Sequence, residues 1–519
     1  DIEPLRTYDW SQDINRNEQL YASIPMPSTD NPDETMMYWS AYTLMRQVFY
    51  PPANLTNYNY YVFSREPTWG WGHGGQVFHE SIAMLAYVFM DAESAQNSQR
   101  VYMERQHDNG YIDYRSGGYL SEQIPTNGEL TTSAPWFSWE NWMIYQESGN
   151  INFLRDAFRS GKKFYQFWLE NRDKDHDGLM EWGGAAWLEA VRDGQVAAWQ
   201  VGDPKNFEAL ALNSMLVKEA RSLAHIADAL GDTAAASDWN YRADTLSQRI
   251  NDTFWDEQTD FYYMVDRDDH DFTFNETDDL KRQEIIGFLP LWSGTATREQ
   301  ADKLVQVLTN TDKFWRKHGV PSLAADDPYY NHAGYWNGPV WVQWEYLIFR
   351  GLLNYGYDQL ARELAQKVFD KVIFHLKRDH TFWEMYSPDT DWAGHHQTYI
   401  WTGIVARMML DLEREITGIE DERDTEGSEI PDQVQLDANH PNPFNPTTMI
   451  TYRLPASQKV SLKVYNLVGQ QVAMLVNNER QHRGTHRVQF DAGDLASGVY
   501  IYRLQTPQRV LSRKMTVIK

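Results

Sequence analysis

Residues 207–230 read FEALALNSMLVKEARSLAHIADAL. Apolar side chains recur in this stretch at spacings of three and four residues, which is the period of one face of an α-helix. Gly231 and Asp232 follow directly and end the pattern, as residues at the end of a helix commonly do. The stretch therefore predicts a long helix that buries most of its surface against other helices.

Similar helical patterns continue up to about residue 417. They lie near 80–91, 153–171, 236–254, 298–308, 340–355, 358–377 and 401–416. The connecting loops are rich in Gly, Trp, Asp and Pro, and little in them predicts strands. About a dozen helices in sequential hairpins fit a toroid, and the absence of a fixed repeat period argues against the alternative, an α-solenoid. We therefore expect residues 1–417 to form an all-α (α/α)6 toroid.

The pattern changes after residue 417. Residues 418–432 read GIEDERDTEGSEIPD, which is acidic and without apolar periodicity, as in a linker. Short stretches of alternating polar and apolar residues follow at 449–454, 460–465, 499–504 and 510–518, each bounded by Pro, Asn or Gly. Such alternation predicts half-buried strands. We expect residues 433–519 to form a small all-β, immunoglobulin-like sandwich.

Composition narrows the possible partners. The chain has 519 residues and a formal net charge of −26, a field that repels nucleic acid and anionic lipid surfaces. The chain contains no run of 18 apolar residues, so the sequence predicts no membrane span. The absence of cysteine excludes disulfides and thiolate chemistry. The first residues, Asp1-Ile2-Glu3, lack a Met and an apolar leader, which we interpret as the mature form of an exported protein.

Aromatic residues are abundant, with 21 Trp and 30 Tyr. Filling a core is their ordinary use. Several Trp nevertheless lie in Gly-rich or polar loops, namely Trp69, Trp71, Trp182, Trp336 and Trp392. Such rings stack on the apolar faces of sugars while their N–H groups bond hydroxyls. This placement favours a saccharide ligand.

Three loops combine carboxyls or amides with aromatic residues: 181–194, 335–341, and 382–390 with Trp392, His395 and His396 close behind. In a helical toroid such loops would converge at one end of the axis and form a pocket. Hydrolysis of a glycosidic bond with inversion needs two carboxyls roughly 6.5–9.5 Å apart, one to protonate the leaving oxygen and one to activate water. The loops can supply such a pair.

Residues 335–341, YWNGPVW, resemble the YWRGPVW block of clan G glycosidases, which include glycoside hydrolase family 63, the trehalases and mannosylglycerate hydrolases. The upstream blocks at 288–291 and 319–322 stand in the same order as in the family. The resemblance covers about residues 35–415. Residues 382–390 resemble the family block that carries the general base. The resemblance therefore implies that Glu384 is the base, with Asn337 in place of the family's Arg.

The general acid is less defined. Glu189 and Asp193 keep the spacing of the family's ESGMD block but not its other residues, so the resemblance implies Asp193 as the acid, with Glu181 and Glu189 as rivals. The resemblance and the loop positions together give a set of expected substrate contacts. These are Trp69, Trp71, Glu189, Arg192, Trp336, Asn337, Trp341, Tyr386, Trp392 and His396.

Residues 439–448, NHPNPFNPTT, resemble the opening block of the type IX secretion C-terminal sorting domain. Later blocks of that domain match at 452–455, 464–470 and 495–500, so the resemblance covers about residues 433–519. It implies that the type IX secretion machinery is a partner and that the protein is secreted or held at the cell surface.

Residues 173–178, DKDHDG, alternate carboxylates as a calcium loop does, but Gly184 stands where an EF-hand has its closing Glu. A solvated acidic turn is one interpretation, and a structural Ca²⁺ on Asp173, Asp175 and Asp177 is the other. His332, His395 and His396 form no zinc motif, since HExxH is absent. We expect that no cofactor is required.

The combined prediction is a secreted, inverting, exo-acting α-glycosidase that acts on an α-glucoside or α-mannoside of an oligo- or disaccharide. Two alternatives stay open. One is a helical-toroid lyase or epimerase that uses His395 or His396 as its base. The other is a carbohydrate-binding surface protein without catalysis. The sugar and its linkage stay undetermined by the sequence.

Overall fold

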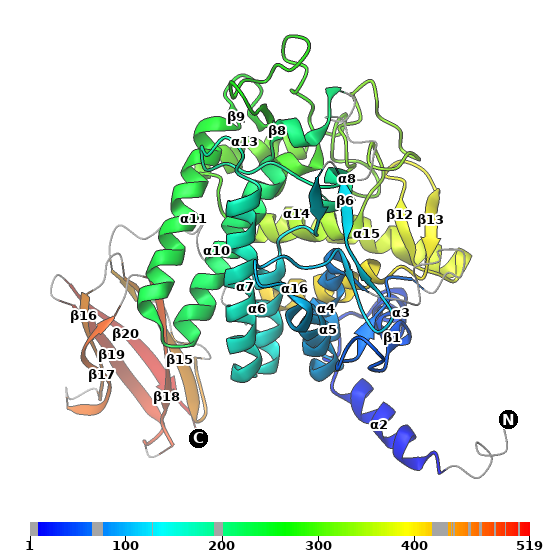
Figure 1. Cartoon of the computed structure of the whole chain (residues 1–519). Coiled ribbons are helices and arrows are strands. Elements are labelled where there is room, and N and C mark those ends of the chain that lie inside the picture. Colours follow the sequence, from blue (N-terminus) through cyan, green and yellow to red (C-terminus); the bar gives the residue numbers. More distant parts are fainter. Residues whose placement is uncertain are drawn as a thin grey trace. The chain divides into compact units, whose positions relative to one another are not determined.

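The computed structural model describes residues 9–518 except 65–75, 127, 191–200, 418–433 and a few short stretches of the C-terminal part. Those stretches are 437–438, 440–441, 455–457, 467–469, 482–483, 494 and 507–508. The chain divides into two compact units, residues 1–427 and 428–519. Figure 1 shows the first as mostly helical and the second as strands.

The first unit contains helices that are buried almost all round. They include α6 (Phe137–Ser148), α10 (Leu210–Ala229) and α14 (Val342–Asn354). The helix predicted at 207–230 is α10, and nearly all of its residues are buried. A helix that is apolar on every side can be stable only with neighbours on every side. These helices therefore form an inner layer.

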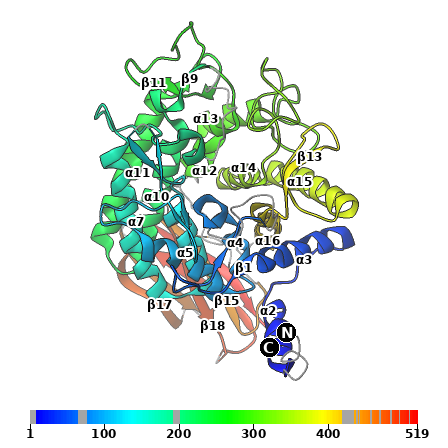
Figure 2. The ribbon, with the colours of Figure 1, turned by 45° about the vertical axis from the view of Figure 1, so that its right-hand side comes forward.

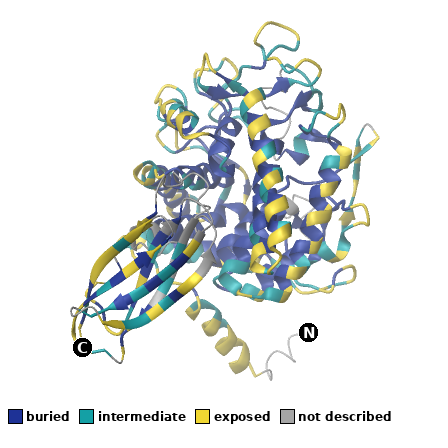
Figure 3. Cartoon of the chain, turned by 90° about the vertical axis from the view of Figure 1, so that its left-hand side faces the viewer, coloured by how far each residue is buried: buried dark blue, intermediate teal, exposed yellow. Residues whose placement is uncertain are grey.

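Other helices bury one face only and form an outer layer. They are α5 (Ala92–Arg105), α7 (Ile151–Asn171), α11 (Thr233–Thr253), α13 (Arg298–Leu308) and α15 (Asp358–Asp379). Helix α7 packs on α6 and α10, α11 packs on α10, and α15 packs on α14. Exposed residues follow the outward sides of such helices in Figure 3. The arrangement is that of helical hairpins with an inner and an outer member.

The ring of helices closes on itself. Helix α16 (Val405–Thr417) packs against α3 (Pro32–Gln47), and α3 also packs against α15. Figure 2 shows the helices following one another around a common centre. The other described helices of this unit are α2 (Ser11–Ala22), α4 (Met84–Tyr87), α8 (Ala186–Glu189) and α12 (Leu289–Ser293), with 3-10 turns η1 (Phe78–Ala83), η2 (Pro204–Asn206), η3 (Ile285–Phe288) and η4 (Ile400–Ile404). The first unit is thus a helical domain of the α/α-barrel type.

The loops of the helical unit contain short antiparallel strands that the sequence did not predict. They are β1 (Phe49–Tyr50), β2 (Tyr60–Tyr61), β3 (Gln76–Val77), β4 (Arg115–Ser116), β5 (Ser121–Glu122), β6 (Ile124–Thr126), β7 (Glu129–Thr131), β8 (Phe207–Glu208), β9 (Trp255–Asp256), β10 (Phe261–Tyr262), β11 (Val265–Asp266), β12 (Trp383–Tyr386) and β13 (Ala393–Gln397). Strands of this length are too short to show a clear alternation. Two of the pairs carry carboxyls that are discussed below: β12–β13 carries Glu384, and β8–β11 carries Glu208.

The second unit consists of two antiparallel sheets with a shared apolar core. One sheet has the order β14–β15–β18 and the other β17–β16–β19–β20. The strands are β14 (Gln435–Leu436), β15 (Thr447–Leu454), β16 (Gln458–Tyr465), β17 (Gln471–Gln481), β18 (Gly484–Asp491), β19 (Gly498–Gln505) and β20 (Val510–Val517). The four predicted strands coincide with β15, β16, β19 and β20, whereas β14, β17 and β18 were not singled out by the sequence.

Within the part of the chain that the structure describes, none of the helices combines the length and the apolar character that crossing a bilayer requires.

Candidate active site

The hairpin of β12 and β13 positions Glu384. Its register shifts between Trp383 and Met385, so that Trp383 pairs with Gln397 while Met385 pairs with Gly394. Such a bulge re-aims the side chains next to it. On the opposite strand His395 adopts a positive φ of 62°, which is unusual for a residue with a side chain. The irregular pairing brings the side chains of Glu384 and His396 into contact.

Glu384 is 1% exposed, yet its carboxylate is well supplied with donors. The hydroxyl of Tyr335 donates to Oε1 at 2.9 Å, and the backbone N–H of His396 donates to Oε2 at 3.3 Å. Nδ1 of the His396 ring also makes a close hydrogen bond to Oε2. A buried carboxylate is stable when donors replace its water. These contacts hold the Glu384 carboxylate in one orientation.

The loop 335–341 meets the hairpin. Val340 and Tyr386 exchange two backbone hydrogen bonds, of 2.7 Å and 3.1 Å. The rings of Trp336 and Trp341 stack with centroids 3.6 Å apart and planes 9° apart. Trp341 also packs edge-on to Tyr335, with a centroid distance of 5.0 Å. Two of the three loops singled out in the sequence therefore converge beside Glu384.

Several expected substrate contacts lie behind this surface. Trp341 and Tyr386 have no exposed area, and Trp336 is 4% exposed. The Tyr386 hydroxyl accepts the backbone N–H of Trp383, and the Trp341 indole donates to the carbonyl of Tyr335. Their roles as substrate contacts stay predictions.

The side-chain amide of Asn337 makes hydrogen bonds within its own loop. Its Nδ2 donates to the carbonyl of Tyr329 at 2.8 Å, and its Oδ1 accepts the N–H of Tyr335 at 3.2 Å. Both halves of the amide are thus used to shape the 329–337 segment. Trp392 is half-buried, and its ring lies against Gly394, where a Cβ would meet it at 2.3 Å. Asn337 and Trp392 are both half-buried, and their roles as substrate contacts stay predictions.

Glu189, an expected contact and a rival for the acid, is fully buried at the end of α8. One oxygen accepts Nη2 of Arg172 at 2.8 Å and the N–H of Thr132 at 2.9 Å, and the other accepts the N–H of Gly183 at 2.9 Å. Three donors thus replace the water that the buried carboxylate has lost. The contacts of Glu189 suit a structural tie more than a proton donor.

Glu181, the second rival, is also fully buried, and burial raises its pKa. Its Oε2 accepts the N–H of Lys174 at 3.2 Å, and its backbone bridges to Glu208. Glu181 instead belongs to a cluster of acidic side chains, which we call the acidic group and which comprises Asp173, Asp175, Asp177, Glu181 and Glu208. It is not part of the surroundings of Glu384. Figure 1 shows β8, which carries Glu208, and the β12–β13 hairpin at separate places of the helical unit.

Four of the expected site residues lie outside the described residues. They are Asp193, Arg192, Trp69 and Trp71. Their roles as acid and as substrate contacts stay predictions.

Tyr335 contacts Glu384 but was not among the expected site residues. Tyr335 belongs to the YWNGPVW motif, but only the rings and amide that follow it were selected from that motif. Its hydroxyl bonds the carboxylate at 2.9 Å. The motif was therefore a sufficient signal for the segment, although it did not show which member reaches the carboxylate.

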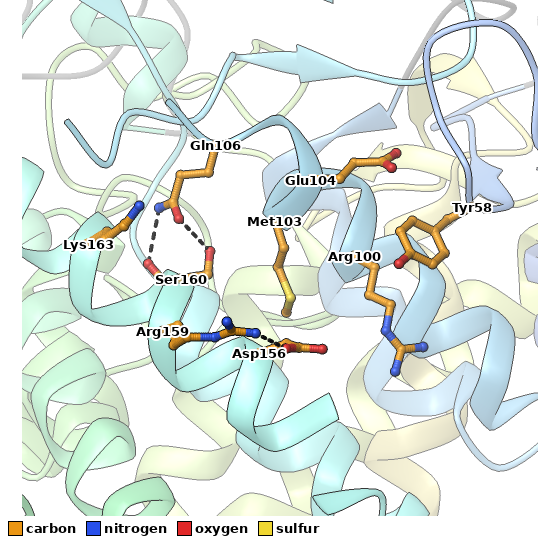
Figure 4. Close-up of a pocket in the computed structure, with 9 residues that line it drawn as sticks. All are labelled: Tyr58, Arg100, Met103, Glu104, Gln106, Asp156, Arg159, Ser160 and Lys163. Carbon is orange, nitrogen blue, oxygen red and sulfur yellow. Dashed lines mark hydrogen bonds and ion pairs between the residues drawn. The ribbon is translucent and has the colours of Figure 1, made fainter. Parts of the chain in front are cut away.

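A separate hollow of about 330 Å³ lies between α5 and α7. Figure 4 shows its lining, in which Arg159 pairs with Asp156 and Gln106 bonds to Ser160. Its other carboxyl, Glu104, bonds Thr56 and Asn57. Both carboxyls of the hollow thus have side-chain partners, and neither belongs to the loops that converge beside Glu384.

A candidate metal position lies in the acidic group. Asp175, Asp177, Glu208 and His270 each bring one ligand atom within 4.8 Å of the others. Only Asp175 and Asp177 of these were suggested by the sequence.

Two family models match the chain. Residues 79–402 match the mannosylglycerate hydrolase MGH1-like glycoside hydrolase domain, and residues 439–519 match the secretion system C-terminal sorting domain. The first match spans more than half of the chain and contains Glu384 and both loops that converge beside it.

Curated relatives are similar in sequence to this chain over part of their length. A probable mannosyl-oligosaccharide glucosidase of Schizosaccharomyces pombe is 26% identical over 330 residues, covering 58% of this chain and 40% of that protein. A mannosylglycerate hydrolase of Rubrobacter radiotolerans is 27% identical over 203 residues, covering 38% of this chain and 42% of that protein. The chain thus spans less than half the length of these two relatives.

A solved structure shares the helical fold. The GH63 mannosylglycerate hydrolase from Thermus thermophilus, determined in complex with Tris, superposes with a TM-score of 0.56 at 17% identity. The superposition covers 72% of this chain and all of that one. At this identity the likeness concerns the fold of the helical unit.

Proposed function

Because the chain belongs to the family of mannosylglycerate hydrolase MGH1-like glycoside hydrolases, we propose that its helical unit is an inverting, exo-acting α-glycosidase that cleaves an α-glucoside or α-mannoside of a small saccharide. The observation that carries the proposal is the buried Glu384 carboxylate, held by Tyr335 and His396 beside an aromatic loop. The sorting domain at residues 439–519 marks the protein as secreted or held at the cell surface.

Glu384 acts as the general base in this proposal. An ionised carboxylate has about four acceptor positions, and three donors from Tyr335 and His396 leave one for a water molecule. Glu384 takes a proton from that water as the water oxygen attacks the anomeric carbon. The fixed orientation matters because the attack must come from the face opposite the leaving group.

Asp193 acts as the general acid and donates a proton to the glycosidic oxygen as the bond to the anomeric carbon breaks. The contacts of Glu189 support this assignment, since Arg172 and two backbone N–H groups already hold its carboxylate. The proton balance is complete: the leaving group gains the proton of Asp193, Glu384 gains one from water, and solvent restores both. Such hydrolysis requires no cofactor.

The decisive test is the stereochemistry of the product. We expect NMR of the first product from an α-linked glucose, mannose or rhamnose substrate, α-mannosylglycerate included, to show the β-anomer before mutarotation. A first-formed α-anomer would exclude inversion. Reaction in ¹⁸O-water should place one labelled oxygen on the anomeric carbon, whereas a product with a ring double bond or an epimerised sugar would point to a lyase or an epimerase.

Variants can separate the two carboxyl roles. Glu384→Gln should lower kcat by about 10³-fold or more on every substrate, with little change in Tm. Asp193→Asn should lower kcat strongly on sugar leaving groups but much less on aryl glycosides, whose phenolate leaves without protonation. Glu181→Gln is the matched control, because a residue that is not the acid shows no such dependence on the leaving group. If Glu181→Gln and not Asp193→Asn shows it, the acid is Glu181.

A further inference from the structure

The hollow between α5 and α7 has the size of a small-molecule site. Its volume is about 330 Å³, and ligand pockets of proteins occupy about 300–1,000 Å³. Residues of the two helices, together with Tyr58, line it (Figure 4). None of the lining residues belongs to the loops that converge beside Glu384. The hollow is therefore a separate place at which the helical unit can bind a ligand.

Two cations of the hollow have no carboxylate partner. Arg100 donates to Oδ1 of Asn97 at 3.2 Å, and Lys163 is exposed on α7. Across the described residues, neither cation forms an ion pair with a carboxylate. The whole chain has 73 Asp and Glu against 47 Lys and Arg, so it offers carboxylates in excess. Cations left unpaired in a hollow of such an acidic protein favour an anionic ligand.

Arg159 supplies a third cation to the hollow. It pairs with Asp156, which lies one turn earlier in α7, and the two side chains are 76% and 41% exposed. Exposed pairs of this kind contribute little to stability, because water competes for both charges. An anionic ligand can therefore replace Asp156 as the partner of Arg159 at little cost.

The second carboxyl of the hollow, Glu104, is held by donors on the preceding loop. It accepts the hydroxyl of Thr56, the N–H of Asn57 at 3.2 Å and Nδ2 of Asn57 at 2.9 Å. These three donors account for most of the acceptor positions of a carboxylate. Glu104 is thus turned to the loop and does not pair with Arg100, which leaves the hollow with an excess of positive charge.

Apolar surface separates the cations of the two helices. The guanidinium of Arg100 lies 5.9 Å from the ring centroid of Tyr58 and 5.5 Å from that of Phe153, so two aromatic contacts hold it in place. Figure 4 shows Met103 between Tyr58 and Arg100 on one side and Lys163 on the other. A sugar ring has an apolar face of C–H groups that packs on surfaces of this kind.

The far wall of the hollow is fixed by hydrogen bonds. Nε2 of Gln106 donates to the carbonyls of Gly110 and Ser160, each at 3.0 Å. Its Oε1 accepts the hydroxyl of Ser160 at 2.9 Å. The amide therefore ties the end of α5 to α7. A wall held in this way is formed before a ligand arrives, which lowers the entropic cost of binding.

We propose that this hollow is a second saccharide-binding site, separate from Glu384, and that it binds saccharides with acidic groups. Arg159 and Lys163 bind one acidic group and Arg100 binds another, while the sugar ring between them packs on Tyr58. The site tethers the secreted protein to an acidic polysaccharide and so raises the local concentration of saccharide chains near the catalytic unit. The proposal goes beyond the proposed hydrolysis and does not depend on it.

The test is calorimetry on the full chain carrying Glu384→Gln, which prevents turnover of the probe. The probes are oligomers of galacturonate, of glucuronate and of sulfated galactose. We expect at least one of them to bind once per chain and to bind more weakly as salt is added, because the contacts are ionic. Absence of binding by all three at about 1 mM oligomer, a concentration that half-saturates even a weak site, would overturn the proposal.

Two further probes separate an acidic saccharide from its parts. The carboxyl-reduced form of the oligomer has the same length and linkage without the charge, and inorganic phosphate has the charge without the sugar. We expect both to bind at least about 10-fold more weakly than the acidic oligomer, a tenfold ratio being resolved readily by calorimetry. Equal binding of the neutral oligomer would exclude the ionic contacts, and equal binding of phosphate would exclude the saccharide assignment.

Variants locate the binding in the hollow. Lys163→Gln and Arg100→Gln should each weaken binding about 5-fold, and together about 25-fold, because the two cations act from different helices. Lys162→Gln is the matched control: Lys162 is the neighbouring cation of α7, but its Nζ lies over Phe158 at 4.3 Å and outside the hollow. Equal weakening by Lys162→Gln would reduce the effect to general electrostatics and contradict the proposal.

An activity measurement keeps this proposal apart from the proposed hydrolysis. In the chain that retains Glu384, Lys163→Gln should leave kcat and KM on a small neutral aryl α-glycoside unchanged. A loss of kcat that matched the loss of binding would show that the hollow is part of the catalytic site and would overturn its separate role. If the chain hydrolyses no glycoside, the proposed hydrolysis fails while the calorimetry still decides the binding site.

Discussion

Glu384 and Glu208 are both buried carboxyls of the helical unit, but their surroundings are opposite in kind. Glu384 receives hydrogen bonds from Tyr335 and from the backbone and ring of His396. Glu208 has no donor among the described residues and faces further carboxyls and His270. Donors make a carboxylate stable as an anion, whereas a carboxylate without donors needs a cation or a proton. The comparison separates a group suited to activating water from a group suited to binding a metal ion.

Two further carboxyls extend this comparison. Glu189 has the cation Arg172 and two backbone donors. Glu219 has two backbone donors and, among the described residues, no ion pair, and burial raises its pKa to about 7. The four carboxyls can thus be ordered by the number and the charge of their hydrogen-bond donors. Three predictions, at Glu189, Glu219 and Tyr335, test this ordering.

The largest effect is expected at Glu189. Glu189→Gln leaves Arg172 buried, and among the described residues its one remaining carboxylate partner is the half-buried Glu129 at 3.5 Å. Breaking a buried ion pair by removing one partner costs about 3–5 kcal/mol. Urea unfolding of the full chain should show this loss, and Glu129→Gln, on the exposed side of the same arginine, should lose about 1 kcal/mol or less. Equal losses in the two variants would contradict the ordering.

The next effect concerns pH and Glu219. Its folded-state pKa of about 7 lies above the ordinary value of 4.5, so the folded protein holds a proton that the unfolded chain releases. The stability from this group is therefore present below about pH 4.5 and is lost as the pH rises through about 7, a change of about 3 kcal/mol.

The matched variant isolates that contribution. Glu219→Gln cannot titrate, so its stability relative to the wild type should increase between about pH 5 and pH 8. Urea unfolding at several pH values in the presence of a chelator measures the difference, in which all groups common to both proteins cancel. Parallel pH profiles of the two proteins would show that Glu219 does not titrate in this range.

The smallest effect is expected for one donor of Glu384. Tyr335→Phe removes the hydroxyl that orients Oε1 and should lower kcat about 10-fold, or about 1.4 kcal/mol, with little change in KM. Tyr330→Phe is the control, since its hydroxyl donates to Asp389 at 2.6 Å instead. If the two variants lose activity equally, the Tyr335 contact does not serve Glu384 in particular.

Much of the fold could be predicted because it follows from local patterns. The 3.6-residue period of 207–230 appears as α10, and four alternating stretches appear as β15, β16, β19 and β20. The short loop strands could not be predicted, since pairs such as β8–β11 contain two residues on each side. They form because neighbouring helices hold their ends in place, not because of their own sequence.

The site shows the same division. The motifs at 335–341 and 382–390 identified Glu384 and the aromatic loop, since a motif is a run of adjacent residues. They did not show that Tyr335 is the residue that bonds the carboxylate or that Trp341 and Tyr386 are turned into the core. Which side chain of a loop faces inward depends on the β-bulge and on the pairing of Val340 with Tyr386.

The sequence by itself determined the helical and strand units, the sorting tail and the segment that carries Glu384, because each is encoded within a few tens of neighbouring residues. Tertiary structure alone decided the partners of the buried carboxyls. The calcium-loop pattern at 173–178 has no closing glutamate at Gly184, and Glu208 and His270 reach it from 24 and 86 residues beyond Gly184. Distances of that kind are set by how helices and loops pack, so no local pattern records them.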